Sequence, residues 1–81
     1  MYYDMRDYND TNTSGNRAIG STIAAAKAYM DSLSYWCAAI QNGGLIRTIC
    51  DSDGNPVCQR SYTVTGIGYN RAVVVSDWYD C

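Results

Sequence analysis

The stretch LIRTICDSDGNPVCQRSYTVT, Leu45–Thr65, places two runs of alternating apolar and polar residues on either side of a turn. β-Branched residues and tyrosine at period two are typical of half-buried strands. The Asp-Gly and Asn-Pro pairs between the runs form turns, because Gly admits positive φ and Asn or Asp accepts local hydrogen bonds. We therefore predict an antiparallel hairpin with strands at Leu45–Cys50 and Val57–Thr65.

The acids of this turn partly match a calcium-binding loop. Asp51, Asp53 and Asn55 alternate as calcium ligands do, but Gly54 stands at the fourth place of the loop instead of the sixth. No Glu is present to supply the bidentate ligand at the twelfth place. We predict a plain turn, with no metal and no cofactor.

The chain has four cysteines, two of which lie in the hairpin region. A chain of 81 residues buries only about 60–65% of its unfolded surface, so its stability is marginal without cross-links. An even number of widely spaced cysteines favours two disulfides in an oxidising compartment over a zinc site. A symmetric hairpin would join Cys50 to Cys58 and leave Cys37 to join Cys81. The alternative joins Cys37 to one strand cysteine and the chain end to the other.

The segments outside the hairpin complete the predicted sheet and add a helix. Val73-Val74-Val75 indicates a third strand at Ala72–Tyr79, so residues 45–81 form an antiparallel meander. We expect residues 1–16 to form a loop or an edge strand. Residues 17–42 carry an apolar stripe at steps of three and four, which predicts one long amphipathic helix closed by a left-handed Gly43. If Gly20 breaks the pattern, Ser21 caps the start of this helix. The stripe consists of Ile19, Ile23, Ala26, Met30, Leu33, Cys37 and Ile40.

These elements predict one domain, residues 1–81, of the α+β class. Its architecture is a two-layer sandwich in which one long amphipathic helix covers an antiparallel sheet of three to four strands, with two disulfides. The opposite helix face is rich in alanine and is either a solvated surface or a packing face for a second toxin chain or a repeated subunit. Its alanines are Ala24, Ala25, Ala28, Ala38 and Ala39.

Charge and sequons bear on partners and location. The net charge is −2 with six basic residues, which argues against nucleic acid and anionic lipid as partners. Asn9 and Asn12 begin glycosylation sequons in a polar stretch. Together with the cysteines they predict a secreted, extracellular protein whose leader has been removed.

Catalysis has few candidate groups in this sequence. The chain has no histidine, and paired cysteines would leave no free thiol. Asp31 and Asp77 are the only acids near predicted apolar surface, and both are typical of solvated or capping positions. We predict that the protein is not an enzyme and has no catalytic residue.

Aromatic residues supply the remaining signal. The chain has eight Tyr and two Trp, more than a small core can bury with every hydroxyl paired. Tyr and Trp are common in interface hot spots, and Arg residues flank the same strands. The candidate binding patch consists of Tyr62, Arg60, Arg71, Trp78 and Tyr79.

With the helix bearing Cys37, the strand SYTVTGIGY and the terminal RAVVVSDWYDC, the region Ser21–Cys81 resembles the small secreted killer toxins of smut fungi and yeasts, and the plant-pathogen effectors that share their fold. This resemblance implies a disulfide-linked α/β sandwich that acts on competing or host cells. A helix leading into an antiparallel sheet also resembles the globular head of a type IV pilin.

The predicted function is therefore that of a secreted toxin or effector that binds a cell-surface or membrane component of a target cell, without catalysis. The alternative is a pilin-like subunit of an extracellular filament.

Overall fold

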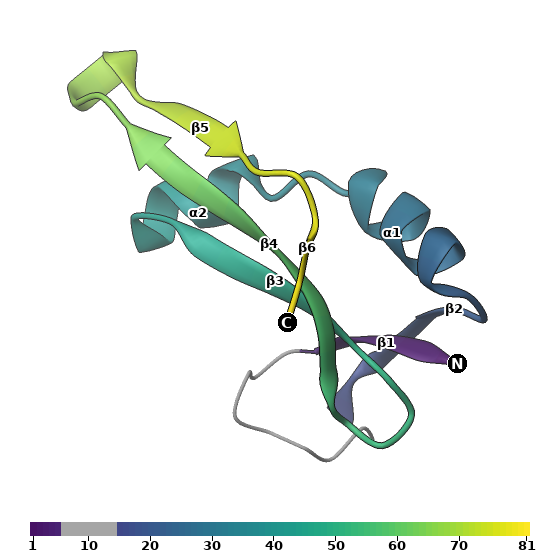
Figure 1. The fold of residues 1–81 in the computed structure, drawn as a ribbon. Coiled ribbons are helices and arrows are strands. Elements are labelled where there is room, and N and C mark those ends of the chain that lie inside the picture. The colour runs from purple at the N-terminus through teal and green to yellow at the C-terminus, as the bar shows by residue number, and fades with distance from the viewer. Residues whose placement is uncertain (6–14) are drawn as a thin grey trace.

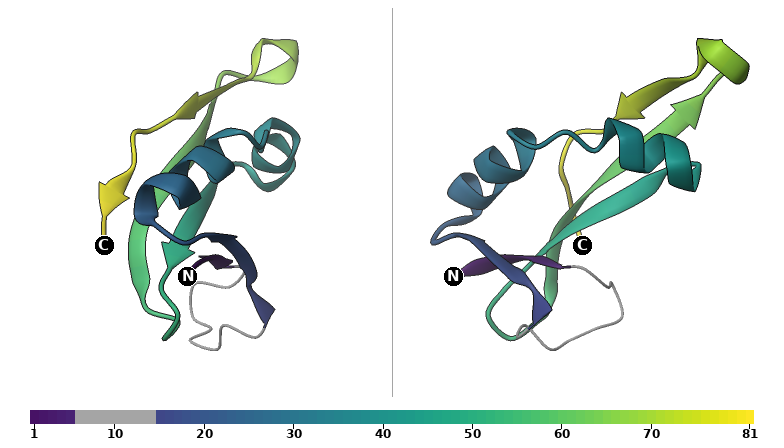
Figure 2. Two further views of the ribbon diagram at one scale, coloured as in Figure 1. Left: turned by 90° about the vertical axis from the view of Figure 1, so that its right-hand side faces the viewer. Right: turned by 180° about the vertical axis from the view of Figure 1, so that it is seen from behind.

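The computed structural model describes residues 1–5 and 15–81, which form a six-stranded antiparallel sheet with two short helices on one of its faces (Figures 1 and 2). The strands are Tyr2–Met5 (β1), Arg17–Gly20 (β2), Leu45–Cys50 (β3), Pro56–Thr65 (β4), Ala72–Val75 (β5) and Tyr79–Asp80 (β6). The helices are Ile23–Asp31 (α1) and Trp36–Asn42 (α2), with a 3-10 turn at Gly68–Asn70 (η2). The strand order is β2-β1-β3-β4-β5, and β6 also pairs with β4.

The β3–β4 hairpin occupies the middle of this sheet, where the alternating pattern predicted it. Its turn is held by the Asp51 carboxylate, whose Oδ1 accepts the backbone N–H groups of Asp53 at 2.9 Å and Asn55 at 3.0 Å. The Gly54 N–H closes the bend on the Asp51 carbonyl at 3.1 Å. The Asp51 side chain therefore accepts hydrogen bonds from the backbone of the turn, as the side chain of an Asx turn does.

The prediction of one long helix over 17–42 is wrong. Its first residues form β2, which pairs with β1 instead of continuing into α1. Helix α1 begins after Thr22, whose Oγ1 accepts the N–H of Ala25 at 3.1 Å, so Thr22 and not Ser21 is the N-cap. Gly20 permits the sharp entry, because a Cβ there would lie 2.7 Å from the backbone nitrogen of Ala26.

A second break separates α1 from α2. The Ser32 hydroxyl donates to the carbonyl of Tyr29 at 2.6 Å, a local bond of the kind by which serine competes with helical geometry. The chain then runs without helix through Tyr35 before α2 begins. Gly43 closes α2 with φ 70°, which confirms its predicted left-handed position.

The two helices cover different parts of the sheet. Helix α1 contacts β2 and β1, whereas α2 contacts β4, β3 and β5 (Figure 2). The alanine-rich face predicted for a single helix is accordingly divided. Ala24, Ala25 and Ala28 are exposed on α1, while Ala39 of α2 is fully buried. No continuous small-residue face runs along both helices.

The N-terminal and C-terminal strands also differ from the expectation. Strand β1 lies inside the sheet, between β2 and β3, and is not an edge strand. The predicted strand Ala72–Tyr79 is divided into β5 and β6 at Ser76, whose hydroxyl accepts the Ser61 N–H at 2.9 Å and donates to the Asp77 carbonyl at 2.9 Å. This side-chain contact replaces regular ladder bonding and bends the chain.

The core lies between the helices and the sheet. Its buried members are Ile19, Ala26, Met30, Ile49 and Cys58, and the partly buried Tyr2, Ile23, Tyr35 and Trp78 pack against them. Within residues 1–5 and 15–81, neither helix has the length and apolar character needed to span a membrane.

The prediction of two disulfides is also wrong. All four cysteines lie in the described part of the chain and all are free. A bulge between Ile49 and Cys50 shifts the hairpin register, so that Cys58 faces Ile49 while Cys50 faces Pro56. Cys37 is exposed on α2, separate from the terminal Cys81 beside β4. Covalent cross-linking therefore gives no support to a secreted, toxin-like or fungal protein.

Candidate functional site

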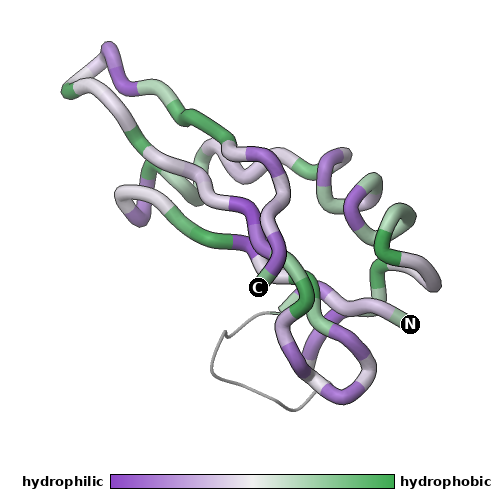
Figure 3. Tube along the Cα trace, in the orientation of Figure 1, coloured by the Kyte–Doolittle hydropathy of each residue, from purple (hydrophilic) through white to green (hydrophobic). Residues whose placement is uncertain are grey.

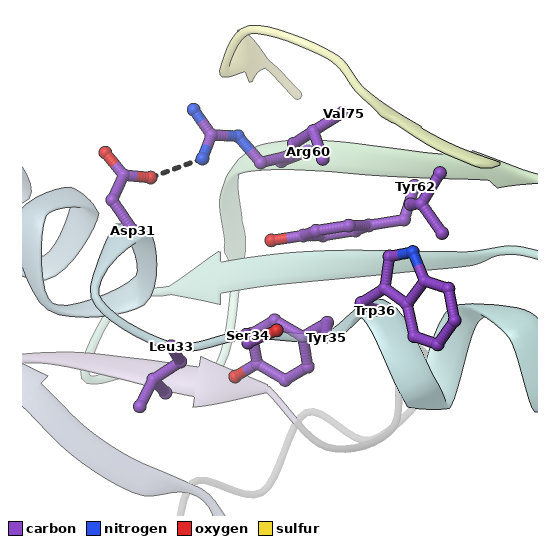
Figure 4. A pocket seen from close by; sticks show the side chains of 9 residues that line it. Asp31, Leu33, Ser34, Tyr35, Trp36, Arg60, Tyr62 and Val75 are labelled. Atoms are coloured by element: carbon purple, nitrogen blue, oxygen red, sulfur yellow. Dashed lines mark hydrogen bonds and ion pairs between the residues drawn. The ribbon is translucent and has the colours of Figure 1, made fainter.

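A cleft of about 270 Å³ opens between the α1–α2 connection and strands β4 and β5 (Figure 4). We call it the aromatic cleft, because rings from both layers line it. Its lining residues are Asp31, Leu33, Ser34, Tyr35, Trp36, Arg60, Tyr62, Val73 and Val75. The break between the helices creates this cleft, since a continuous helix would have carried these residues along one rod.

The apolar part of the cleft is built from rings and valines. Tyr62 of β4 is only 6% exposed, and Tyr35 meets it edge-on with ring centres 5.6 Å apart and planes at 64°. Val75 is the cross-strand partner of Tyr62 on β5. Trp36, at the start of α2, leaves 51% of its surface exposed. Edge-to-face rings fix one another's orientation, so the buried part of the cleft is preorganised while Trp36 remains free to contact a ligand.

A polar cluster closes one end of the cleft. Asp31 forms an ion pair with Arg60, and the Trp78 indole N–H donates to the same Asp31 Oδ1 at 3.0 Å. The Arg60 guanidinium lies over the Trp78 ring, 4.8 Å from its centre. The Nε of Arg60 is buried and has no hydrogen-bond partner among the described residues. The three side chains therefore hold one another, and the half-exposed Asp31 carboxylate presents charge to the solvent side.

A second cluster supports the cleft from inside the sheet. The Asp4 side chain, 5% exposed, forms ion pairs with Arg47 and, at 3.3 Å, with Arg17. Arg47 in turn lies over the Tyr35 ring at 4.9 Å from its centre. Burial, and then the negative charge of Asp4, raise the pKa of Tyr35 above its ordinary value of 10.0. The Tyr35 phenol is therefore neutral at physiological pH, and its hydroxyl donates to the Sδ of Met30 at 3.9 Å.

The structure brings together only part of the predicted binding patch. Arg60 and Tyr62 line the cleft, and Trp78 packs on Arg60. Tyr79 pairs with Gln59, the residue next to Arg60, so it points to the opposite face of the sheet. Arg71 lies at the far end of the β4–β5 hairpin, where its Nε donates to the Gly68 carbonyl at 3.1 Å.

Other sequence candidates lie in different places. Asp31 is part of the cleft, whereas Asp77 is exposed beyond β5. The two sequon residues Asn9 and Asn12 lie outside the described residues. No group of three metal-ligating side chains occurs within residues 1–5 and 15–81.

Sequence reasoning missed Tyr35, Trp36 and Ser34 as cleft residues. A long helix would have put Trp36 on the flank of the apolar stripe, with no partner from β5. The signal in the sequence was the SLSYW run, in which two serines surround Leu33 just before two aromatic residues. Serine favours helix ends, and aromatic residues are poor helix formers, so this run interrupts a helix.

The buried thiols of the sheet and the groups that line the cleft differ in what they can do chemically. Burial raises the pKa of the Cys50 and Cys58 thiols, which makes both poor nucleophiles at neutral pH. The cleft combines an apolar interior with a carboxylate and a guanidinium at one end. Its volume is below the roughly 300–1,000 Å³ typical of pockets for drug-sized ligands, so it suits a single side chain of a partner.

Comparisons with known proteins do not assign this site: no family model, no curated protein and no solved structure matches the chain.

Proposed function

We propose that this protein is a binding module whose aromatic cleft takes one aromatic or aliphatic side chain that projects from a protein partner. The observation that carries the proposal is the half-exposed Trp36 at the mouth of a cleft floored by the buried Tyr62 and the partly buried Tyr35. A preordered pocket beside an exposed Trp is the usual composition of an interface hot spot, where a few aromatic and Arg residues supply most of the affinity.

The charged end of the cleft adds specificity to this apolar contact. Arg60 is already balanced by Asp31 and stacked on Trp78, so a ligand does not need to neutralise it. Asp31, with 46% of its side chain exposed, remains able to accept a hydrogen bond from a partner. We therefore expect a partner that presents a backbone or side-chain donor next to its anchoring side chain.

A peptide library displayed on phage and selected against the wild-type protein tests this function. We expect enriched peptides to share one aromatic or large aliphatic residue, and their affinity to fall about tenfold or more in Trp36→Ala. Ser34→Trp, which fills the cleft from an exposed position, should abolish binding. Tyr69→Ala is the matched control, since Tyr69 is a fully exposed aromatic residue outside the cleft. Peptides whose affinity is unchanged by Trp36→Ala and by Ser34→Trp would contradict the proposal.

The biological setting is a separate part of the proposal. A toxin or effector that binds a cell-surface component, and a pilin-like filament subunit, are both compatible with a cleft that captures a partner's side chain. The gene sequence upstream separates them: a cleavable secretory signal supports the toxin or effector, whereas a prepilin leader followed by an apolar helix supports the filament subunit. If the upstream sequence has neither of these features, both settings are excluded and only the binding function remains as a proposal.

A further inference from the structure

Strand β5 forms an unprotected edge of the sheet. In the described part of the chain it has a neighbour, β4, on one side only. It contains no Lys, Pro or charged residue, and Val74 and Val75 are 56% and 47% exposed. Figure 3 shows it as a hydrophobic segment between hydrophilic ends. Sheet edges with these properties pair readily with another strand, and proteins normally block them.

The backbone of β5 is oriented for such pairing. The N–H of Ser76 donates to the carbonyl of Ser61 on β4 at 3.0 Å. Because hydrogen-bonded residues alternate along an antiparallel ladder, Val74 also directs its backbone groups to β4. Val73 and Val75 therefore turn their N–H and C=O groups to the outer edge.

Charges at the two ends of β5 indicate which strand pairs with this edge. Arg71 precedes the strand and Asp77 follows it, both exposed and neither in an ion pair among residues 1–5 and 15–81. If a second copy of the chain pairs antiparallel about a two-fold axis at Val74, each Arg71 lies level with Asp77 of the other copy, one residue beyond the bend at Ser76. The same register places Val73 opposite Val75, whose outward backbone groups form the hydrogen-bonded pairs. A shift of this register by two residues loses the charge match.

We propose that β5 is a homodimerisation edge, at which two copies of this chain join their sheets antiparallel with reciprocal Arg71–Asp77 pairs. The axis stands perpendicular to the sheet, so both helical layers and both aromatic clefts lie on one face. The two β4 strands would be about 14 Å apart, three strand spacings, which leaves room for the two α2 helices at interaxial distances of about 8–10 Å.

The opposite edge of the sheet explains why the assembly closes at two copies. Strand β2 is as short as β5 but carries the charged Arg17, whereas β5 has no charged residue, so β2 disfavours further strand addition. An isologous contact through β5 uses the same surface in both copies, so it closes as a dimer and does not extend into a fibre.

Charge exchange tests the proposal most sharply, with sedimentation equilibrium as the readout and circular dichroism as the check of folding. We expect the wild-type protein to dimerise with rising concentration. The single variants Arg71→Asp and Asp77→Arg should weaken the dimer about tenfold or more, because each sets like charges opposite one another. The double variant, Arg71→Asp with Asp77→Arg, should restore it. Val74→Asp, which brings two carboxylates together at the axis, should be monomeric.

Three results would overturn the dimer. The first is a wild-type protein that stays monomeric at the concentrations used for NMR. The second is a dimer that neither single charge variant nor Val74→Asp weakens. The third is a double variant that does not recover dimerisation, since this result would reject the register centred on Val74. Trp36→Ala, which changes the cleft and not the edge, should dimerise like the wild type, so failure of the binding proposal is distinguishable from failure of this one.

Discussion

The indole N–H of Trp78 donates to Oδ1 of Asp31 at 3.0 Å, so the last residue of α1 is tied to a residue that follows β5. Arg60 from β4 completes the contact by pairing with Asp31 and stacking on Trp78. One carboxylate thus joins the helical layer to β4 and to the β5–β6 connection at the end of the aromatic cleft. This contact fixes the position of Arg60 in the lining of the cleft.

Replacing Asp31 tests the strength of this contact. Asp31→Ala removes both hydrogen bonds and leaves Arg60 without its carboxylate, and we expect the free energy of unfolding to fall by about 1–2 kcal/mol. Asp31→Asn keeps an acceptor for Trp78 and should lose about half as much, because the half-exposed ion pair is screened by solvent. Urea denaturation followed by tryptophan fluorescence measures both variants. Equal stability of Asp31→Ala and the wild type would mean that the contact does not hold the two layers together.

The N-cap of α1 gives a second prediction. Thr22→Ala removes the hydroxyl that accepts the Ala25 N–H, and should lower the free energy of unfolding by about 1 kcal/mol. Ser21→Ala is the matched control, because Ser21 is exposed and should contribute little. The measurement is the midpoint of urea denaturation. A larger effect at Ser21 than at Thr22 would move the helix start and contradict the fold.

Removal of the buried Asp4 carboxylate gives the largest predicted loss in the free energy of unfolding. Asp4→Asn removes the charge that Arg17 and Arg47 both contact, which leaves the Arg47 guanidinium largely buried without its counter-charge. We expect the free energy of unfolding to fall by about 3 kcal/mol, as when one partner of a buried ion pair is removed. Asp53→Asn, at an exposed position in the β3–β4 turn, should change it by less than about 0.5 kcal/mol. Similar losses in the two variants would show that Asp4 has no special role.

The buried thiols predict how stability depends on pH. Burial raises the pKa of Cys50 and Cys58 above the ordinary value of 9.0. The unfolded chain therefore loses its thiol protons at a lower pH than the folded protein does. The free energy of unfolding should be insensitive to these groups below about pH 8 and should fall as the pH rises above about 9.

Cys58→Val separates this thiol from other groups that ionise in the same range. Valine suits a buried strand position and cannot ionise, so the fall in stability above about pH 9 should be shallower than in the wild type. Urea denaturation at a series of pH values measures both proteins. An unchanged slope in Cys58→Val would mean that the Cys58 thiol is not protected in the folded state.

The central strands were predictable, because their pattern is local. Leu45–Cys50 alternates at period two, and Asp51 with Gly54 supplies the turn, so nearest-neighbour chemistry is sufficient to locate this hairpin. The role of β1 was not predictable in the same way. Its interior position depends on pairing with β2 and β3, and on the contact of Asp4 with Arg47 across 43 positions of the chain.

The prediction of one helix over residues 17–42 was wrong although its sequence pattern is local and regular. The apolar stripe over 17–42 is regular, but tertiary pairing took Arg17–Gly20 into β2 and the serines at 32 and 34 interrupted the helix. Apolar residues at helical spacing can also serve a strand followed by two short helices, since each segment buries its own apolar side chains. The cleft was not predicted because the break between α1 and α2 was not predicted. Trp36 lines a cleft together with β5 only when α2 is a separate helix.

The cysteines were misread because spacing does not reveal register. Cys50 and Cys58 flank a turn symmetrically in the sequence, but the bulge at Ile49 and Cys50 sets them out of register in the hairpin. Only Arg60, Tyr62 and Trp78 of the predicted patch come together, because Tyr79 lies one strand position beyond Trp78 and takes the opposite face.

The aromatic cleft is tested most directly by NMR titration of isotope-labelled protein with p-cresol, the side-chain analogue of tyrosine. We expect saturable shifts at the amides of Ser34 and Trp36, and at the Trp36 indole N–H, with no comparable shift at the exposed Tyr69. In Trp36→Ala the shift at Ser34 should become too weak to saturate. Saturable binding centred elsewhere, no saturable binding in the wild type, or a Ser34 shift that Trp36→Ala leaves unchanged would contradict the aromatic cleft as the binding site.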